Sequence, residues 1–343
     1  MSFMLTVYSP KHVLHSPQTE LHRGQVIPYH ESVRRAELII DAVKAAHLGD
    51  IVEPSEFGLA PLRSVHGDEY LAFLQSVYQE WLDSNQKGDA IPHVWIGRSL
   101  RTILPNSIFG RLGYFSYDAS TPFTAGTWQA ALASAEVALT AAERLQGNHR
   151  AVFGLTRPPG HHAAADVCGG YCFLNNAAIA AQSLIHAGAD RVAIVDVDYH
   201  HGNGTQSIFY DRRDVLFVSL HANPTNAYPY FLGYADEQGS GPGQGYNVNI
   251  PLPEGTNWSQ YDQALQSALK RVEDFAPDSI VISLGVDTFE SDPICNFKLK
   301  SEDFRKMGDR IAALRLPTVL LMEGGYAVDS LGTNVINVLS AFC

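Results

Sequence analysis

The sequence predicts an α/β protein, built as a single-domain α/β/α sandwich around a mostly parallel multi-stranded sheet. From about residue 127, Ala-rich amphipathic stretches alternate with short β-branched runs, which is typical of parallel strands joined by covering helices. The length of 343 residues is compatible with one core, because α/β chains of this size often form one domain. We therefore expect one domain over residues 1–343.

The expected elements follow from the periodicity of each stretch. The predicted strands are the runs AVFGL, RVAIVDV, VLFVSL, SIVISL and TVLLM. Helices are expected over residues 127–145, 176–187, 258–275, 301–314 and 331–341. Thr127 is expected to cap the first of these helices, and Gly188 to mark the end of the second.

Residues 84–125 show neither helical nor strand periodicity and are predicted to form a long loop insertion. A loop of this length is usually functional or disordered. It carries Trp95, Phe109, Tyr114, Phe115 and Tyr117, and such aromatic side chains favour burial over disorder. We expect a lid or a subunit contact.

The composition excludes several classes of protein. Hydrophobic residues make up 45% and charged residues 17% of the chain, and no apolar run reaches the roughly 18 residues of a membrane span. The first residues, MSFMLTVYSPKH, lack the features of a secretory signal, so a cytoplasmic location is expected. Four cysteines are too few for a disulfide framework and are interpreted as reduced packing residues.

The formal net charge of −12 disfavours nucleic acid as a partner. The same charge would concentrate a cationic substrate near the protein. An even spread of carboxylates for solubility is the better single explanation of the charge.

Each of the five predicted strands ends in a polar cluster. The clusters are RPPGHHAA, DVDYHHGNG, SLHAN, GVDTFESDP and MEGGYA. Any one of them is compatible with ordinary turn chemistry. Because the carboxyl ends of parallel strands form the ligand crevice of an α/β sheet, five such clusters on one edge predict an active site.

The stretch DVDYHHGNG has the composition of a metal site. Asp198 and His200 lie two residues apart, so an extended backbone points both side chains the same way, and Asp196 shares that face. Together with Asp287 they form an oxygen and nitrogen triad suited to one Zn²⁺ with an open position for water or substrate. The same donors also accept Fe²⁺ or Co²⁺. A helix cap in the loop GVDTF is the less favoured alternative for Asp287.

Other polar residues at the strand ends suit catalysis beside a metal. His161 and His162 supply a general base and a cationic partner, with Asp196 and Asn203 available to orient them. Tyr326 could stabilise an oxyanion, and a core tyrosine is an equally good interpretation of that residue alone. Gly170, Tyr171 and Tyr228 offer aromatic walls for a narrow channel, although stacking in the hydrophobic core explains these residues equally well.

The motifs RPPGHH, GGYCFLNN, DVDYHHGNGTQ, SLH, GVDTFESDP and MEGGY occur in this order over residues 157–326. In these motifs the chain resembles the zinc-dependent deacetylases of the arginase/deacetylase superfamily. The stretches TELHRG, FLGYADE and residues 84–125 are similar to bacterial acetylpolyamine amidohydrolases within that superfamily. Gly202 stands where dinuclear arginases carry a further aspartate, which disfavours a second metal and ureohydrolysis.

The resemblance implies a role for each site residue. It implies one zinc ion on Asp198, His200 and Asp287, His162 as general base and acid, and Tyr326 as the group that polarises the acetamide carbonyl. It further implies that His161 pairs with Asp196 and that Asn203 orients His162. The resemblance implies substrate contacts from a set of five residues: Glu20, Gly170, Tyr171, Tyr228 and Phe109. Phe109 departs from the acidic residue expected there for a polyamine ammonium.

The resemblance also implies a structural monovalent cation and a homodimer. The cation, K⁺, is expected near a set of five residues: Asp196, Asp198, His200, Ser219 and Leu220. The homodimer is expected to form through residues 84–125.

The expected activity is zinc-dependent hydrolysis of the N-acetyl amide of a polyamine or another small cationic alkylamine. Deacetylation of acetyl-lysine in proteins is the alternative on the same machinery. A rigid, enclosed loop 84–125 would restrict entry to slender substrates, whereas an open rim would admit peptides. A metal-stabilised acyl-amine binding module without turnover is the non-enzyme alternative, against which the intact His161, His162 and Tyr326 speak.

Overall fold

The chain forms a central parallel sheet. The computed structural model describes residues 4–147 and 149–343. The eight strands lie in the order β4-β1-β5-β10-β9-β6-β7-β8, and the pairings between neighbours are parallel. The prediction of an α/β fold with a mostly parallel sheet is therefore confirmed. The strands are β1 (Leu5–Tyr8), β4 (Ile51–Val52), β5 (Ala151–Leu155), β6 (Val192–Asp196), β7 (Val215–Ala222), β8 (Asn247–Leu252), β9 (Ser279–Leu284) and β10 (Thr318–Met322).

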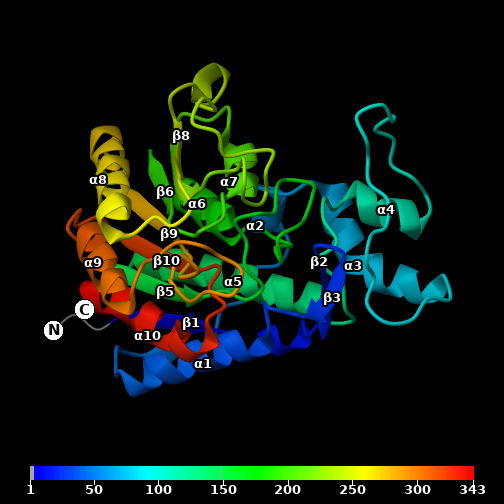
Figure 1. Ribbon diagram of the computed structural model, residues 1–343, viewed down its shortest axis with the longest axis horizontal. Coiled ribbons are helices and arrows are strands. Elements are labelled where there is room, and N and C mark those ends of the chain that lie inside the picture. Colours follow the sequence, from blue (N-terminus) through cyan, green and yellow to red (C-terminus); the bar gives the residue numbers. More distant parts are fainter. Residues whose placement is uncertain (1–3, 148) are drawn as a thin grey trace.

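Helices cover both faces of the sheet, as Figure 1 shows. Side chains alternate along a strand, so Val152 faces one helical layer and Phe153 the other. One face carries α1 (Val33–Ala45), α8 (Trp258–Phe275), α9 (Ser301–Ala312) and α10 (Val328–Leu339). The other face carries α3 (Asp68–Asp83), α5 (Thr127–Leu145) and α6 (Asn176–His186). None of the helices in the described ranges combines the length and apolar character needed to cross a membrane.

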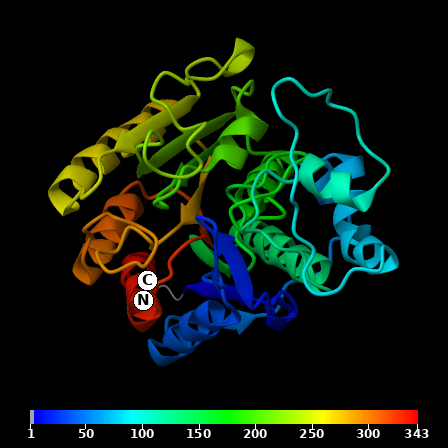
Figure 2. The same cartoon turned by 45° about the vertical axis from the view of Figure 1, so that its right-hand side comes forward.

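Shorter elements lie around the sheet and its covering helices. They include the hairpin of β2 (Thr19–His22) and β3 (Gln25–Pro28), the helices α2 (Ala60–Arg63), α4 (Ile108–Tyr114) and α7 (Asn203–Phe209), and the 3-10 turns Pro10–Leu14, Gly241–Gly243 and Ser340–Phe342. In Figure 2 the hairpin stands in front of the sheet.

The five predicted strands and five predicted helices are present, with ends that differ by up to three residues. Gly188 directly follows the C-cap Ala187 and has a φ of 110°, so its predicted place at a helix end is confirmed. The predicted cap at Thr127 is wrong, because Gly126 takes that position. The Thr127 hydroxyl instead accepts a hydrogen bond from the Thr124 N–H, at 2.7 Å, and contacts His15. The Thr127 hydroxyl is thus engaged by other partners and does not cap the helix.

Residues 84–125 extend from one side of the molecule, at the right of Figure 1. The segment contains α4 and is closed at its base by a bridge between Ala90 and Phe123. Phe115 is buried, as its aromatic character predicts. Trp95 is 37% exposed, so the expectation of burial is wrong for this residue.

A buried ionic cluster joins elements that are distant in sequence and lie beneath the strand ends. The Glu31 carboxylate accepts hydrogen bonds from Arg35, at 2.8 Å, and from Arg157, at 2.9 Å. Arg35 also donates to the carbonyls of Glu323 and Gly325, which follow β10. Since removing one partner leaves uncompensated buried charge, such a cluster holds its elements in one arrangement.

Candidate metal-dependent active site

The polar clusters that follow β5, β6, β9 and β10 meet at one edge of the sheet. β6 ends at Asp196, which lies in register with Ser219 of β7 and Ser283 of β9. The chain then leaves the sheet as a turn, and this turn presents Asp198 and His200 over the strand ends. The loop after β9 brings Asp287 to the same place.

The three predicted metal ligands converge. His200 Nδ1 lies 3.1 Å from an oxygen of Asp287 and 3.3 Å from an oxygen of Asp198. Backbone N–H groups fix both carboxylates: Tyr199 donates to Asp287 at 2.8 Å, and Gly324 donates to Asp198 at 2.8 Å. Hydrogen bonds within the protein therefore hold the ligand atoms close together.

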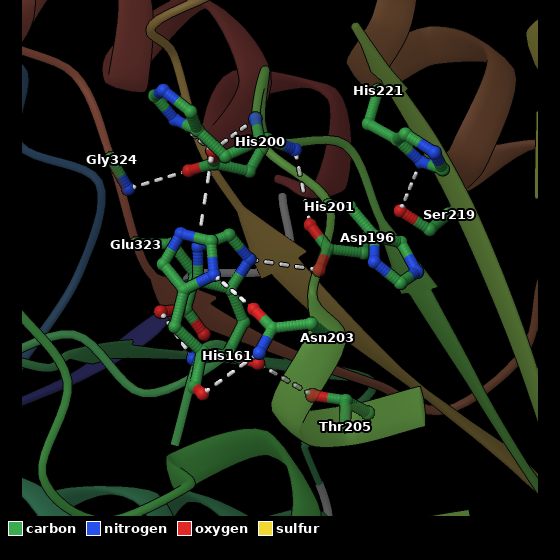
Figure 3. Close-up of polar contacts among 12 residues, drawn as sticks. His161, Asp196, His200, His201, Asn203, Thr205, Ser219, His221, Glu323 and Gly324 are labelled. Atoms are coloured by element: carbon green, nitrogen blue, oxygen red, sulfur yellow. Dashed lines mark hydrogen bonds and ion pairs between the residues drawn. The ribbon is translucent and has the colours of Figure 1, made fainter. Parts of the chain in front are cut away.

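Gly324 leaves the space between the two carboxylates open. A Cβ at this position would lie 2.5 Å from an oxygen of Asp198 and 2.6 Å from an oxygen of Asp287. Only glycine is compatible with this close approach, and its N–H is needed as the donor to Asp198. Gly324 is labelled in Figure 3, beside the carboxylate to which it donates.

The charges of the cluster are appropriate for a cation. Burial and the charge of Asp198 raise the pKa of Asp287 to about 7. Burial also acts to raise the pKa of Asp198, but His161 and His200 outweigh it and hold that pKa below its usual range. Two buried carboxylates this close repel each other, and a divalent ion would relieve that repulsion. The donor set of two oxygens and one nitrogen fits such an ion.

Two buried cysteines lie beside the site. Ligand atoms of His200, Asp287 and Cys295 lie within 4.8 Å of one another, and so do those of His161, Cys172 and Glu323. Burial raises the pKa of both thiols well above the usual value, so both are protonated. The cysteines are free, as expected from the sequence. Cys295 differs from a simple packing residue because its sulfur lies beside the predicted metal ligands His200 and Asp287.

The two histidines of the loop after β5 have opposite electrostatic character. His161 Nδ1 lies 2.9 Å from Asp196, a contact visible in Figure 3. Burial lowers the pKa of His161, but Asp196 and Asp198 outweigh burial and raise it to about 10. Burial and the charge of His161 lower the pKa of His162 well below its usual value. At neutral pH, His161 is therefore a cation and His162 a neutral base.

Asn203, the first residue of α7, determines which nitrogen of His162 carries the proton. Its carbonyl oxygen lies 2.6 Å from His162 Nδ1, and its amide group donates to the Tyr117 hydroxyl at 3.3 Å. An amide oxygen can only accept, so Nδ1 must be protonated. The lone pair of His162 is then on Nε2, the nitrogen free to act as a base.

Glu323 positions the histidine loop and was not singled out from the sequence. Its carboxylate accepts hydrogen bonds from the N–H groups of Gly160, at 2.7 Å, and His161, at 3.2 Å. Burial raises the pKa of this carboxyl to about 7. The motif MEGGY thus contributes the Glu323 carboxylate, which holds the histidine loop, in addition to the predicted Tyr326.

Tyr326 lies at the same edge, in contact with a buried cation. The Arg35 guanidinium carbon lies 4.8 Å from the centre of the Tyr326 ring, and Asp292 accepts the Tyr326 N–H at 2.8 Å. Burial raises the pKa of the Tyr326 hydroxyl well above its usual value, so it remains a hydrogen-bond donor.

A cavity of about 300 Å³ opens onto these groups. Its buried end is formed by His162, His200 and Tyr326, and aromatic side chains form much of its wall. Gly170, Tyr171 and Tyr228 line it, as predicted. Further lining residues that the sequence did not reveal are His22, Arg23, Asp118, Tyr230 and Asn296.

Asp118 is held in place by three donors. Its carboxylate accepts hydrogen bonds from the Gly170 N–H at 2.6 Å, the Tyr228 hydroxyl at 2.7 Å and the Ser120 N–H at 3.1 Å. Gly170 has a φ of 56°, and a Cβ there would lie 2.2 Å from the His162 ring. Gly170 thus lies between the Asp118 carboxylate and the ring of the neutral His162.

Two of the predicted substrate residues are placed differently. Glu20 is only 1% exposed and lies behind the wall, where its carboxylate accepts a hydrogen bond from the Tyr171 hydroxyl at 2.9 Å and contacts His30. Phe109 lies on α4, packed against Trp81 and His93, and does not line this cavity. The structure therefore does not bring Phe109 to the site within one chain.

The chain is similar to proteins of known family. The model of the histone deacetylase domain matches residues 29–342. The chain belongs to the histone deacetylase domain family. The resemblance inferred from the motifs is therefore confirmed.

Several members of this family are similar over their full length. The chain is 54% identical to acetylpolyamine amidohydrolase 2 of Pseudomonas aeruginosa, covering 99% of this chain and 98% of that one. It is 48% identical to the acetylpolyamine amidohydrolase of Mycoplana ramosa, covering 98% of each. The crystal structure of an acetylpolyamine aminohydrolase from Burkholderia pseudomallei superposes with a TM-score of 0.94 at 41% identity, covering 99% of this chain and 98% of that one.

Substitution of Gly324 tests the metal site directly. In Gly324→Ala the new methyl group would collide with the Asp198 and Asp287 carboxylates, so we expect metal affinity to fall by roughly ten- to a hundredfold. Metal content after dialysis against graded zinc concentrations measures this loss. Gly67→Ala is the control, because a Cβ there meets nothing within 4 Å. Equal metal retention by the two variants would contradict the assignment.

Proposed function

We propose that the protein hydrolyses the N-acetyl amides of polyamines or other small cationic alkylamines, releasing acetate and the free amine. The proposal rests on the buried end of the cavity, which we call its floor. There a neutral His162 lies beside a cationic His161 and the three convergent metal ligands. The names of the full-length relatives support the choice of substrate.

The proposed metal is one Zn²⁺ per chain, held by Asp198, His200 and Asp287. When bound, it supplies Lewis acidity for the amide carbonyl and lowers the pKa of water. His162 Nε2 takes a proton from the attacking water, because Asn203 keeps the other ring nitrogen protonated. The same nitrogen then gives the proton to the departing amine.

His161 and Tyr326 stabilise the charge that develops during the reaction. His161 stays protonated against Asp196, and its positive charge compensates negative charge at the floor of the cavity. The Tyr326 hydroxyl donates to the amide oxygen as that oxygen becomes an anion. Neither group changes its protonation state in this scheme.

The wall of the cavity favours a slender cation. Tyr171, Tyr228 and Tyr326 offer ring faces to an alkyl chain and to an ammonium group. Asp118 adds a carboxylate whose position is already set by its three donors. We propose that the substrate ammonium pairs with Asp118, whereas Glu20 supports Tyr171 from behind.

A structural K⁺ is proposed beneath the metal site, near Asp196, Asp198, His200, Ser219 and Leu220. Asp196 and Ser219 lie side by side in the register of β6 and β7, which supports a shared site. The ion would compensate buried carboxylate charge. If this proposal is correct, the protein has a higher melting temperature in potassium buffer than in sodium buffer.

The proposed activity is tested by comparing kcat/KM for acetylputrescine, acetylcadaverine and acetylspermidine with that for an acetyl-lysine peptide. We expect the zinc-loaded protein to prefer the small amines, because the cavity has a volume of only about 300 Å³ and carries the Asp118 carboxylate on its wall. His162→Ala should reduce turnover by roughly a hundred- to ten-thousandfold through loss of the base. Equal or faster turnover of the peptide would identify a protein deacetylase instead.

The role of the tyrosine hydroxyl is tested by Tyr326→Phe. Loss of this donor should lower kcat by roughly a hundred- to a thousandfold and change KM little, because the hydrogen bond strengthens as the oxyanion forms. Metal content should remain that of the wild type. Tyr78→Phe on α3, distant from the cavity, is the matched control, and a wild-type kcat in Tyr326→Phe would rule out the role.

We also propose that the protein is a homodimer through residues 84–125. This segment exposes Leu100 by 59% and Ile103 by 56%, and the nearby Phe231 is 83% exposed. Trp95, Tyr230 and Phe231 line an apolar groove of about 670 Å³. Clustered apolar exposure of this kind is typical of an interaction surface.

Sedimentation velocity tests the dimer. The wild type should sediment with twice the 37.5 kDa of one chain, and Leu100→Asp combined with Ile103→Asp should shift it to the mass of one chain. Val13→Asp serves as the control, since Val13 is also exposed but lies outside the segment. A monomeric wild type at micromolar concentration would refute the proposed interface.

A further inference from the structure

The hairpin of β2 and β3 forms one side of the mouth of the cavity. His22 and Arg23 line the cavity, and Arg23 occupies the tight turn with a φ of 49°. Arg23 is exposed, whereas His162 and Tyr326 at the other end of the cavity are buried. The guanidinium therefore belongs to the exposed entrance of the cavity, and the reacting groups belong to its buried end.

The hairpin is fixed to the wall of the cavity. Glu20 on β2 accepts the Tyr171 hydroxyl at 2.9 Å, and Tyr171 itself lines the cavity. Glu20 also contacts His30, which follows β3, at 3.1 Å. These contacts hold the base of the hairpin, so Arg23 keeps its charge on one side of the entrance.

The charge of Arg23 acts on the groups around it. The pKa of His22 is lowered, first by burial and then by Arg23, and Glu20 opposes these effects. The pKa of His30 is raised, mainly by its hydrogen bond to Glu20. Glu20 is thus engaged by His30 and Tyr171 and lies buried, so it is poorly placed to neutralise the exposed guanidinium.

The cavity therefore presents two opposite charges to a bound substrate. Asp118 is adjacent to Gly170, which contacts the His162 ring, so its carboxylate lies near the reacting end. Arg23 lies at the exposed end. An ammonium a few carbons from the acetyl group meets the carboxylate, and any group beyond that ammonium approaches the guanidinium.

We propose that Arg23 is a specificity-determining residue that selects by the charge at the far end of the substrate. It disfavours a second ammonium, as in acetylated triamines, and favours a carboxylate, as in free amino acids acetylated on the side-chain amine. In such an amino acid the α-ammonium pairs with Asp118 and the α-carboxylate with Arg23. This assignment rests on the proposed hydrolysis of acetylated amines at the same site.

Two matched pairs of substrates isolate the effect of charge. Nε-acetyl-L-lysine differs from acetylcadaverine only by its carboxylate, and N8-acetylspermidine extends acetylputrescine by an aminopropyl group with a further ammonium. The measurement is the ratio of kcat/KM within each pair, so a general loss of activity in a variant cancels. The variants are Arg23→Gln and Arg23→Glu, with Arg150→Gln as the control, because Arg150 precedes β5 at the opposite edge of the sheet.

In Arg23→Gln we expect the ratio of acetyl-lysine to acetylcadaverine to fall by roughly three- to tenfold, the size of one exposed charge–charge interaction. The ratio of acetylspermidine to acetylputrescine should rise by a similar factor. Arg23→Glu should move both ratios further in the same directions. Both shifts should diminish at high salt, since exposed charges are screened.

The outcomes separate this assignment from the proposed function. If the four substrates are hydrolysed and both ratios are unchanged in Arg23→Gln and Arg23→Glu, the role of Arg23 is refuted while the proposed function stands. If Arg150→Gln shifts the ratios as much as Arg23→Gln does, the effect is one of net charge and the assignment also fails. If the zinc-loaded wild type hydrolyses none of the four, the proposed function itself fails, and the assignment with it.

Discussion

The burial of carboxylates at the ends of parallel strands is the constraint on which the rest of this structure depends. Asp196, Asp198, Asp287 and Glu323 are fully buried within one edge of the sheet. An isolated buried carboxylate is very costly, so each must be paired, hydrogen-bonded or neutralised. Backbone N–H groups satisfy part of this need, the His161 cation satisfies another part, and the remaining charge favours a bound metal ion.

The same constraint connects the catalytic groups to the body of the fold. Arg35 donates to the carbonyls of Glu323 and Gly325 and lies against the Tyr326 ring, while its own charge is balanced by Glu31. One ion-pair cluster thus sets the position of the loop that carries the tyrosine. Displacing these buried, paired charges would leave them uncompensated, so the cluster fixes the groups at the floor of the cavity in advance of substrate binding. Electrostatic catalysis depends on such preorganised groups.

Sequence reasoning predicted the fold from the local periodicity of each element, and it predicted the floor of the site because the carboxyl ends of parallel strands meet at one edge of the sheet. Alternation of strands and helices fixes where strand ends meet, and Asp198 and His200 lie two residues apart in one turn. Asp118 was not predicted, because it lies in residues 84–125, which follow no predicted strand. Only tertiary contacts with Gly170 and Tyr228, 52 and 110 residues away, place it at the site. The predicted cap at Thr127 failed for a related reason, since a contact with His15, 112 residues away, engages its hydroxyl.

Chemistry and selectivity are therefore carried by different parts of the fold. The floor comes from strand ends inside the sheet, where each polar atom has several partners and substitution is costly. The entrance comes from the exposed turn of the β2–β3 hairpin and from the residue 223–240 loop that carries Tyr228 and Tyr230, where a side chain can change without disturbing the core. In the proposed function, a guanidinium on such a turn alters which substrates enter and leaves the proposed proton transfer by His162 unchanged.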